Sequence, residues 1–337
     1  MKLLPCIRST RMRDEACTGP CTESGSVTMM NIITLTLSPA FDVHCRGNLI
    51  LAHENLVHMT ACQAGGKGVN ISRALIRNGC PNRSLVVLGE ENADGFLKNL
   101  SADGLDYTAI FTPGRIRENI TIRAEDGTET RISFPGFAAQ PGLLDRISES
   151  LLSEADSETV ITMTGRVPEG IEVAQVKEML HRAKGRGARI VVDSRSFTLE
   201  DLLDLKPWLI KPNKEEIAAY LGREVRCLQE TCREAKTLHE AGIANVMISM
   251  GAEGALLVCD EGIFLAIPPK VTVLSTIGAG DSSIAGFLSA AADGCNGEKR
   301  LARAVAYGTA ACMTQGTEPP GKEDVQRIEP LVRLQCR

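Results

Sequence analysis

The sequence has 337 residues, of which 43% are hydrophobic, 23% are charged and 4% are aromatic, and its formal net charge is −5. These values are ordinary for a globular protein, and the length allows one large domain or two small ones. The negative charge argues against a nucleic-acid partner, and the scarcity of aromatic residues excludes a broad stacking surface for single strands. No apolar run reaches the roughly 18–20 residues that span a bilayer, so we expect no membrane partner.

The first 28 residues are polar, contain three of the twelve cysteines and lack an apolar stretch of signal-peptide length. We predict that residues 1–28 are either a disordered extension without a role in the fold or the product of an upstream start. The cysteines are scattered, without Cys-x-x-Cys pairs or zinc-finger spacing. This pattern favours reduced thiols and a cytoplasmic protein.

The first half of the remaining chain mixes strands, helices and one hairpin. Residues 31–37 alternate and are rich in β-branched side chains, which predicts a first strand that enters the core. Residues 116–134 predict a hairpin, because Ile120 and Ile122 alternate with other residues on one arm and Glu-Asp-Gly at 125–127 supplies a turn. Between these segments we predict edge strands or a flap over 43–64, helices over 69–78 and 94–103, and strands over 84–88 and 107–111.

From residue 160 onward, strands and helices alternate. This order predicts a parallel sheet with helices on both faces, that is, a doubly wound α/β fold. Ligands bind beyond the carboxyl ends of the strands in such sheets, where we expect Asp42, Asn213, Asp281 and residues 164–165 and 249–251. The predicted strands are 160–163, 189–193, 209–211 and 245–250, and the predicted helices are 170–186, 215–221 and 231–241.

The turn Thr-Ile-Gly-Ala-Gly-Asp-Ser at 276–282 is the most informative segment. A glycine turn that opens a helix directs unpaired N–H groups and the positive end of the helix dipole at one point. The N–H groups of Ala279, Gly280 and Asp281 can therefore hold a phosphoryl group while the Asp281 carboxylate takes a proton from a hydroxyl. Gly278 and Gly280 let an anion approach the backbone. The alternative is an ordinary capped helix.

Two further segments complete a recognisable pattern: Gly-Gly-Lys-Gly-Val-Asn at 65–70 and Lys-Pro-Asn-Lys-Glu-Glu at 211–216. With the Gly-Ala-Gly-Asp turn, they resemble motifs of the PfkB (ribokinase-like) family of carbohydrate kinases, in the family's order, from about residue 30 to about residue 320. Leu-Ser-Pro-Ala-Phe-Asp at 37–42 resembles the Asn-Pro-Ala-x-Asp segment of its phosphofructokinase branch.

The resemblance implies a ribokinase-like fold: a doubly wound, mostly parallel sheet flanked by helices, with a small β-sheet lid over the sugar. It implies one kinase domain over residues 29–337. We assign the lid to about 43–62 and 106–134, the segments that do not fit the alternation. In the family this lid is often used in dimerisation, so we expect a homodimer through it.

Asn213 and Glu216 lie three residues apart at the start of a predicted helix, so one face can present both to a hydrated magnesium ion. In the family this Asn-x-x-Glu position organises Mg²⁺ and the phosphates of ATP. The alternative is a capping box, with Asn213 as the N-cap. We place the rest of the nucleotide along Ser249, Gly251 and Gly254, although two glycines after a strand are a weak signal.

We assign the sugar to Asp42, Gly66 and Asn70, because the first and last can bind ring hydroxyls and the glycine lets the ring lie against backbone. Arg117 and Arg131 lie on the two arms of the predicted hairpin, and paired guanidinium groups suit a phosphate. They resemble the positions that hold the sugar phosphate in the phosphofructokinase branch. The alternative is two solvated arginines.

Lys67 and Arg166 bear on which sugar phosphate fits. A lysine in Gly-Gly-Lys-Gly resembles fructose-1-phosphate and tagatose-6-phosphate kinases, and its ammonium could serve as a further point charge for phosphate. The alternative is a lysine that faces solvent. Arg166 stands where the branch usually has serine, in Gly-Arg-Val-Pro instead of Gly-Ser-Leu-Pro. It can add a phosphate contact or change the preferred substrate.

The sequence thus predicts an ATP-dependent kinase of a ketohexose phosphate, with fructose 1-phosphate accepting at its 6-hydroxyl. Tagatose 6-phosphate and fructose 6-phosphate remain alternatives. A catalytically silent sugar-phosphate sensor on the same scaffold is an alternative of another class. A dinucleotide-dependent oxidoreductase is set aside, because no Gly-x-Gly-x-x-Gly follows the first strand.

Overall fold

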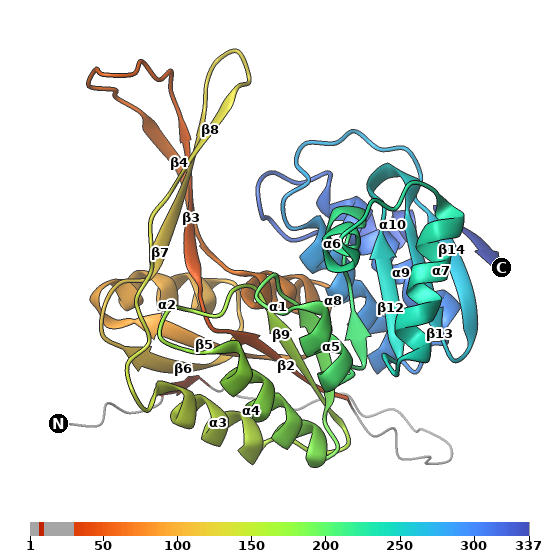
Figure 1. Ribbon diagram of the computed structural model, residues 1–337. Coiled ribbons are helices and arrows are strands. Elements are labelled where there is room, and N and C mark those ends of the chain that lie inside the picture. Colours follow the sequence, from red (N-terminus) through yellow and green to blue (C-terminus); the bar gives the residue numbers. More distant parts are fainter. Residues whose placement is uncertain (1–6, 10–29, 337) are drawn as a thin grey trace, which may run out of the picture.

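The computed structural model describes residues 7–9 and 30–336, which form a large sheet flanked by helices and a small second sheet (Figure 1). The large sheet has the strand order β1-β6-β5-β2-β9-β10-β11-β12-β13-β14-β15. Its strands are β1 (Ile7–Ser9), β2 (Asn31–Thr36), β5 (Arg83–Gly89), β6 (Asp106–Thr112), β9 (Thr159–Thr164), β10 (Arg189–Asp193), β11 (Leu209–Ile210), β12 (Asn245–Ser249), β13 (Ala255–Cys259), β14 (Gly262–Ile267) and β15 (Arg333–Cys336).

All pairs from β6 to β12 in this order are parallel, whereas β1 at one end and β13, β14 and β15 at the other are antiparallel. The predicted doubly wound, mostly parallel α/β sheet is therefore confirmed. The sequence analysis did not predict β13 and β14, because both are short apolar runs, of which β13 is fully buried, and such runs do not show the alternation typical of a strand.

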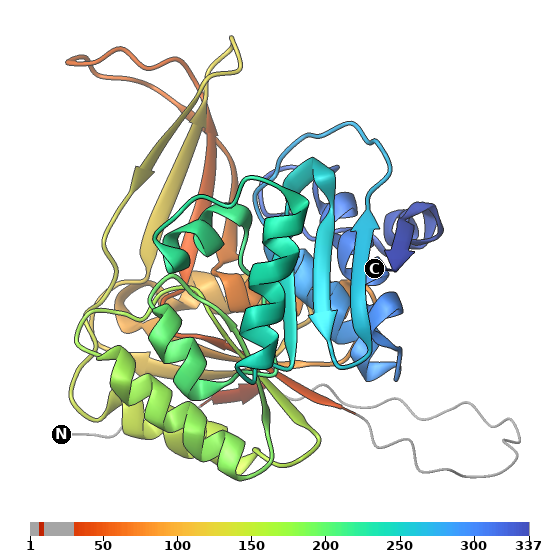
Figure 2. The same cartoon turned by 45° about the vertical axis from the view of Figure 1, so that its right-hand side comes forward.

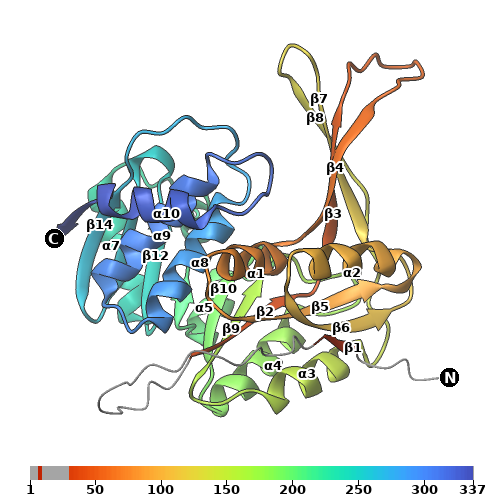
Figure 3. The ribbon, with the colours of Figure 1, turned by 180° about the vertical axis from the view of Figure 1, so that it is seen from behind.

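Helices cover both faces of the large sheet and bury three apolar clusters. One face carries α3 (Leu143–Ser153), α4 (Val173–Gly185), α5 (Leu199–Leu205), α6 (Lys214–Leu221) and α7 (Leu228–Glu240), most clearly seen in Figure 2. The other face carries α1 (Lys67–Arg77), α2 (Ala93–Ala102), α8 (Ala279–Ala292), α9 (Gly297–Ala311) and α10 (Lys322–Ile328), which lie in front in Figure 3. Short 3₁₀ helices occur at η1 (Glu90–Asn92), η2 (Gly251–Glu253) and η3 (Glu329–Leu331). Within the described residues, no helix is long and apolar enough to cross a bilayer.

The small sheet projects away from the large one (Figures 1 and 2) and has the order β4-β3-β7-β8. Its strands are β3 (Ala40–Arg46), β4 (His58–Gly65), β7 (Arg117–Arg123) and β8 (Glu129–Ser133). We call this sheet the lid. Because opposed residues share a face, Asp42 lies on one face with Gln63 and Asn119, and Val43 lies on the other with Cys62 and Ile120.

Two boundaries from the sequence need correction. Residues 106–112 were assigned to the lid, but they form β6, which pairs with β5 inside the large sheet because its side chains are mostly buried there. Residues 7–9 were assigned to an extension without a role in the fold, but they form β1, which pairs with β6. The other residues of the 1–28 segment lie outside the described part of the chain.

Candidate active site

The glycine turn opens α8 as the sequence predicts, and Asp281 lies in the first turn of that helix. Gly278 is the N-cap and adopts the left-handed conformation (φ 79°), which strains any residue with a Cβ. Asp281 is buried, with 7% of its surface exposed, and Asn70 Nδ2 donates a hydrogen bond to its Oδ2 at 2.9 Å. The structure therefore brings the predicted base and the predicted sugar-binding amide of α1 into direct contact.

Burial raises the pKa of Asp281 to about 6, against the opposing charge of Lys67. At a pH of about 6, half of the Asp281 carboxyl groups are then ionised. A pKa this close to neutral pH suits a general base. The raised pKa reflects the cost of placing a charge in a site that excludes water.

This pKa predicts how activity depends on pH. We expect kcat/KM to fall about tenfold per pH unit below pH 6, because protons then occupy the group that must accept one. The loss of activity should not come from unfolding. Between pH 3.8, the ordinary pKa, and about pH 6, Asp281 binds more protons in the folded than in the unfolded state. Its contribution to the free energy of unfolding therefore rises as the pH is lowered through this range. A kcat/KM value that stays constant from pH 5 to 8 would contradict this role, and circular dichroism checks the fold.

Two lysines and a second aspartate surround this carboxyl group. Lys67 Nζ forms an ion pair with Asp193 Oδ2 at 2.8 Å. Burial lowers the pKa of Lys67, but Asp193 and Asp281 outweigh it and hold the pKa above its ordinary value. Burial also raises the pKa of Asp193, but Lys211 and Lys67 outweigh that effect and lower the pKa. Lys67 therefore faces the carboxylates of Asp193 and Asp281.

The sequence analysis missed Lys211 and Asp193 as site residues. Lys211 is buried, and its Nζ lies 3.1 Å from where a Cβ on Gly280 would be, so it adjoins the N–H groups of the turn. Both residues sit at the carboxyl ends of buried strands, β11 and β10. A charged residue at that position of a parallel sheet is the signal that could have found them.

Asn213 and Glu216 form a capping box at the start of α6. Asn213 Oδ1 accepts from Glu216 N at 2.8 Å, and Glu216 Oε2 accepts from Asn213 N at 3.1 Å. Glu216 Oε1 also accepts from Arg195 Nε at 3.1 Å. The helix capping that the sequence analysis gave as the alternative is thus present in the structure. It does not exclude a metal role, because each side chain keeps a further oxygen or lone pair.

The side-chain oxygens of Asn213 and Glu216 are suitable for a hydrated magnesium ion. Amide and carboxylate oxygens are the ligands that Mg²⁺ prefers, and it usually keeps several waters while it bridges substrate phosphates. Among the described residues, no group of three or more His, Cys, Asp or Glu side chains could hold a metal ion directly. Asn213 and Glu216 could therefore hold Mg²⁺ only through water and the phosphates of a nucleotide.

Ser249 lies beside Asn213, because the two residues form a parallel β-bridge and Ser249 N donates to Pro212 O at 3.0 Å. At Gly251 a Cβ would meet open space, so a ligand can approach. At Gly254 a Cβ would lie 1.9 Å from Ala266 O. Packing of the β13–β14 hairpin therefore explains Gly254 without a nucleotide.

The sugar side of the site centres on Asp42, whose Oδ1 accepts from Asn119 Nδ2 at 3.0 Å. A Cβ on Gly65 would lie 2.2 Å from Asp42 Oδ2, so this glycine makes room for the carboxylate. The neighbouring Gly66 has φ 114° and is the N-cap of α1, so the turn itself requires it. The sequence analysis did not name Asn119, which orients Asp42 from the neighbouring strand.

Arg117 lies close to Arg166 instead of Arg131. The pKa of Arg117 is lowered, first by burial and then by the positive charge of Arg166. Its Nε is buried without a hydrogen-bond partner among the described residues, and its Nη1 donates to Asn119 Oδ1 at 3.4 Å. Arg131 pairs with Thr121 of β7. Thr121 lies on the same face as Arg117 but four residues, or about 13 Å, further along the strand. Arg131 is 57% exposed and pairs with Glu129 at 3.7 Å.

Comparisons with known proteins identify the family of the chain. The family model described as "pfkB family carbohydrate kinase" matches residues 44–324. The chain is 34% identical over 258 residues to 1-phosphofructokinase of Escherichia coli K12, covering 76% of this chain and 83% of that protein. It is 30% identical to 1-phosphofructokinase of Haemophilus influenzae, covering 90% and 97%. Phosphofructokinase-2 from Escherichia coli, solved in complex with potassium, superposes with a TM-score of 0.84 at 26% identity, covering 90% of this chain and 99% of that one.

Proposed function

The chain belongs to the pfkB family of carbohydrate kinases and is a phosphotransferase, and on that premise we propose that it phosphorylates fructose 1-phosphate at the 6-hydroxyl. The observation that carries the proposal is the buried Asp281 at the glycine-rich start of α8, held by Asn70. Tagatose 6-phosphate and fructose 6-phosphate are the competing substrates.

The residues divide the reaction among them. Asp281 accepts the proton of the attacking hydroxyl, and the N–H groups of Ala279, Gly280 and Asp281 hold the transferring phosphoryl group as its charge develops. Lys67 and Lys211 help to neutralise that charge. Phosphoryl transfer needs little more than such alignment and charge stabilisation.

A nucleotide and a metal complete the site. ATP would lie along Ser249 and Gly251, and Mg²⁺ would be held through water by Asn213 and Glu216. When bound, Mg²⁺ would supply positive charge to offset that of the phosphates. Gly254 is kept as a nucleotide-binding residue only because it lies in the same turn as Gly251.

The preference for a phosphorylated sugar rests on Arg117 and Arg166. Two neighbouring guanidinium groups, one with an orphan buried Nε, favour a bidentate phosphate ligand. Asp42, Gly66 and Asn70 are then left for the ring hydroxyls. Arg131 would have to swing away from Glu129 to reach the same phosphate.

Steady-state kinetics with fructose 1-phosphate, fructose 6-phosphate and tagatose 6-phosphate test the proposal. We expect the highest kcat/KM for fructose 1-phosphate with MgATP. A higher value for either of the others reassigns the substrate, and inactivity on all three defeats the claim.

We also propose a homodimer through the lid. Large apolar side chains are exposed on its outward face and on its connecting loops: Ile50, Leu51, Leu56, Met59, Ile132 and Phe134. Such a patch on a projecting sheet favours a self-complementary interface. We expect sedimentation velocity to give twice the monomer mass, and Ile132→Glu to shift the protein toward monomer. A monomeric wild-type protein at micromolar concentration would contradict the proposal.

A further inference from the structure

The loop between α9 and α10, residues 312–321, contacts the segment that leads into the glycine turn. Leu274 N donates to Cys312 O at 2.8 Å, and Ser275 N approaches the same oxygen at 3.3 Å. A Cβ on Gly278 would lie 3.7 Å from Thr317 Cα. The N-cap of α8 therefore rests directly against this loop.

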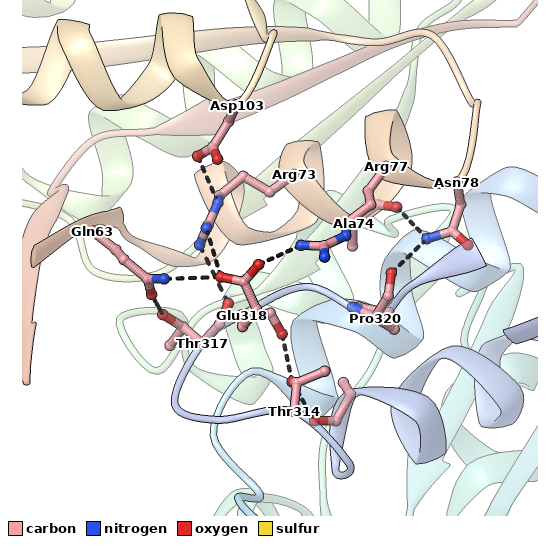
Figure 4. Close-up of polar contacts among 11 residues, drawn as sticks. Gln63, Arg73, Ala74, Arg77, Asn78, Asp103, Thr314, Thr317, Glu318 and Pro320 are labelled. Atoms are coloured by element: carbon pink, nitrogen blue, oxygen red, sulfur yellow. Dashed lines mark hydrogen bonds and ion pairs between the residues drawn. The ribbon is translucent and has the colours of Figure 1, made fainter. Parts of the chain in front are cut away.

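The same loop contacts the lid through one side chain of β4 (Figure 4). Gln63 Nε2 donates to Glu318 Oε2 at 2.9 Å, and Gln63 Oε1 accepts from Thr317 Oγ1 at 3.3 Å. Gln63 faces Asp42 across the β3–β4 pair, on the same side of the lid. Its amide thus ties the strand beside the sugar-binding carboxylate to the loop beneath the anion-binding turn.

Helix α1 holds the loop in place through two arginines. Arg73 Nη1 donates to Thr317 O at 3.3 Å and Nη2 to Glu318 Oε2 at 3.4 Å, while Arg77 donates to Glu318 Oε1. Arg73 is 4% exposed, and its Nε lies 2.8 Å from Asp103 Oδ2, so two cations face two carboxylates. Because a buried charge is costly without its partners, this arrangement fixes Glu318 in one position.

Arg73 also lies one helical turn after Asn70, the residue that holds Asp281. Thr317 and Glu318 therefore contact both Gln63 of the lid and Arg73 of the helix that carries Asn70. Thr317 also adjoins Gly278, the N-cap of α8. A second hydrogen bond between lid and core, from Asn99 Nδ2 to Cys62 O at 3.2 Å, does not touch this loop.

We propose that Gln63 and Glu318 form a positioning link that sets the lid and its bound sugar relative to the glycine turn that receives the phosphoryl group. The link touches neither substrate. It acts by alignment, and a small misplacement of reacting atoms lowers the rate of transfer without weakening binding. This inference depends on the proposed kinase activity only for its kinetic test.

The test is Gln63→Met, which keeps the size of the side chain and removes both hydrogen bonds while Glu318 keeps its arginines. We expect kcat to fall about tenfold or more, with KM for sugar phosphate and ATP within about threefold of wild type. Asn99→Ala is the matched control, since it removes a lid–core bond outside the loop, and should leave kcat unchanged. Adding Thr317→Val to Gln63→Met should cause no further loss, because both changes break the same contact.

Amide hydrogen exchange provides a readout that needs no turnover. We expect residues 274–281 to exchange faster in Gln63→Met than in wild type or Asn99→Ala, because loosening the loop loosens the turn that rests on it. Unchanged exchange and kcat in Gln63→Met would overturn the link, as would an equal loss in Asn99→Ala. If the wild-type protein phosphorylates none of the sugars, the proposed function fails, and the exchange data still decide the link.

Discussion

Replacing Asp281 by Asn is expected to lower kcat by about 10²–10⁴-fold while the protein still binds its sugar phosphate. The amide cannot accept the hydroxyl proton, but it keeps the size of the carboxyl group. Because Asp281 is buried with a raised pKa, losing its charge should not destabilise the fold. Turnover is measured with MgATP, and sugar binding by calorimetry without nucleotide.

The matched control is Asp293→Asn at the other end of the same helix. Asp293 caps the carboxyl end of α8 and pairs with Arg303, far along the helix from the glycine turn. This variant should keep wild-type kcat. If Asp281→Asn retained full activity, the general-base role would be wrong, and if no variant or wild type turned over, the silent sensor would become the better reading.

Lys211→Met should lower kcat by about 10²–10³-fold, the usual effect of removing one preorganised charge beside a developing anion. Lys211 Nζ adjoins Gly280 in the turn, and its charge helps to keep Asp193 ionised. Lys67 still pairs with Asp193 in the variant, so the buried carboxylate retains one partner. Single-turnover phosphoryl transfer measures the effect directly.

Lys184→Met is the control for this prediction. Lys184 lies at the carboxyl end of α4 and donates to the carbonyls of Leu205 and Lys206 at 2.8 Å. It should lower the melting temperature and leave kcat per folded enzyme unchanged. An equal loss of kcat in both variants would mean that Lys211 acts through stability alone.

The sequence by itself determined the fold class and the chemical centre of the site. The alternation of strands and helices required a parallel sheet, because each crossover returns the chain to the same edge. The glycine turn predicted an anion-binding helix start, because the first N–H groups of a helix have no partner within the helix. Asp281 was named from this local pattern, whereas Asn70 and the metal role of Asn213 and Glu216 were named with the help of the family resemblance.

Only the tertiary structure decided which distant residues meet. No pattern predicts that Arg117 would lie near Arg166 instead of Arg131, because the spacing depends on the register of β7 and β8 and on the path of the loop after β9. Lys211 and Glu318 acquire their surroundings from elements that are remote in sequence. Local propensity fixes periodicity and turns, whereas pairing register and loop packing arise from contacts between segments that the chain brings together only on folding.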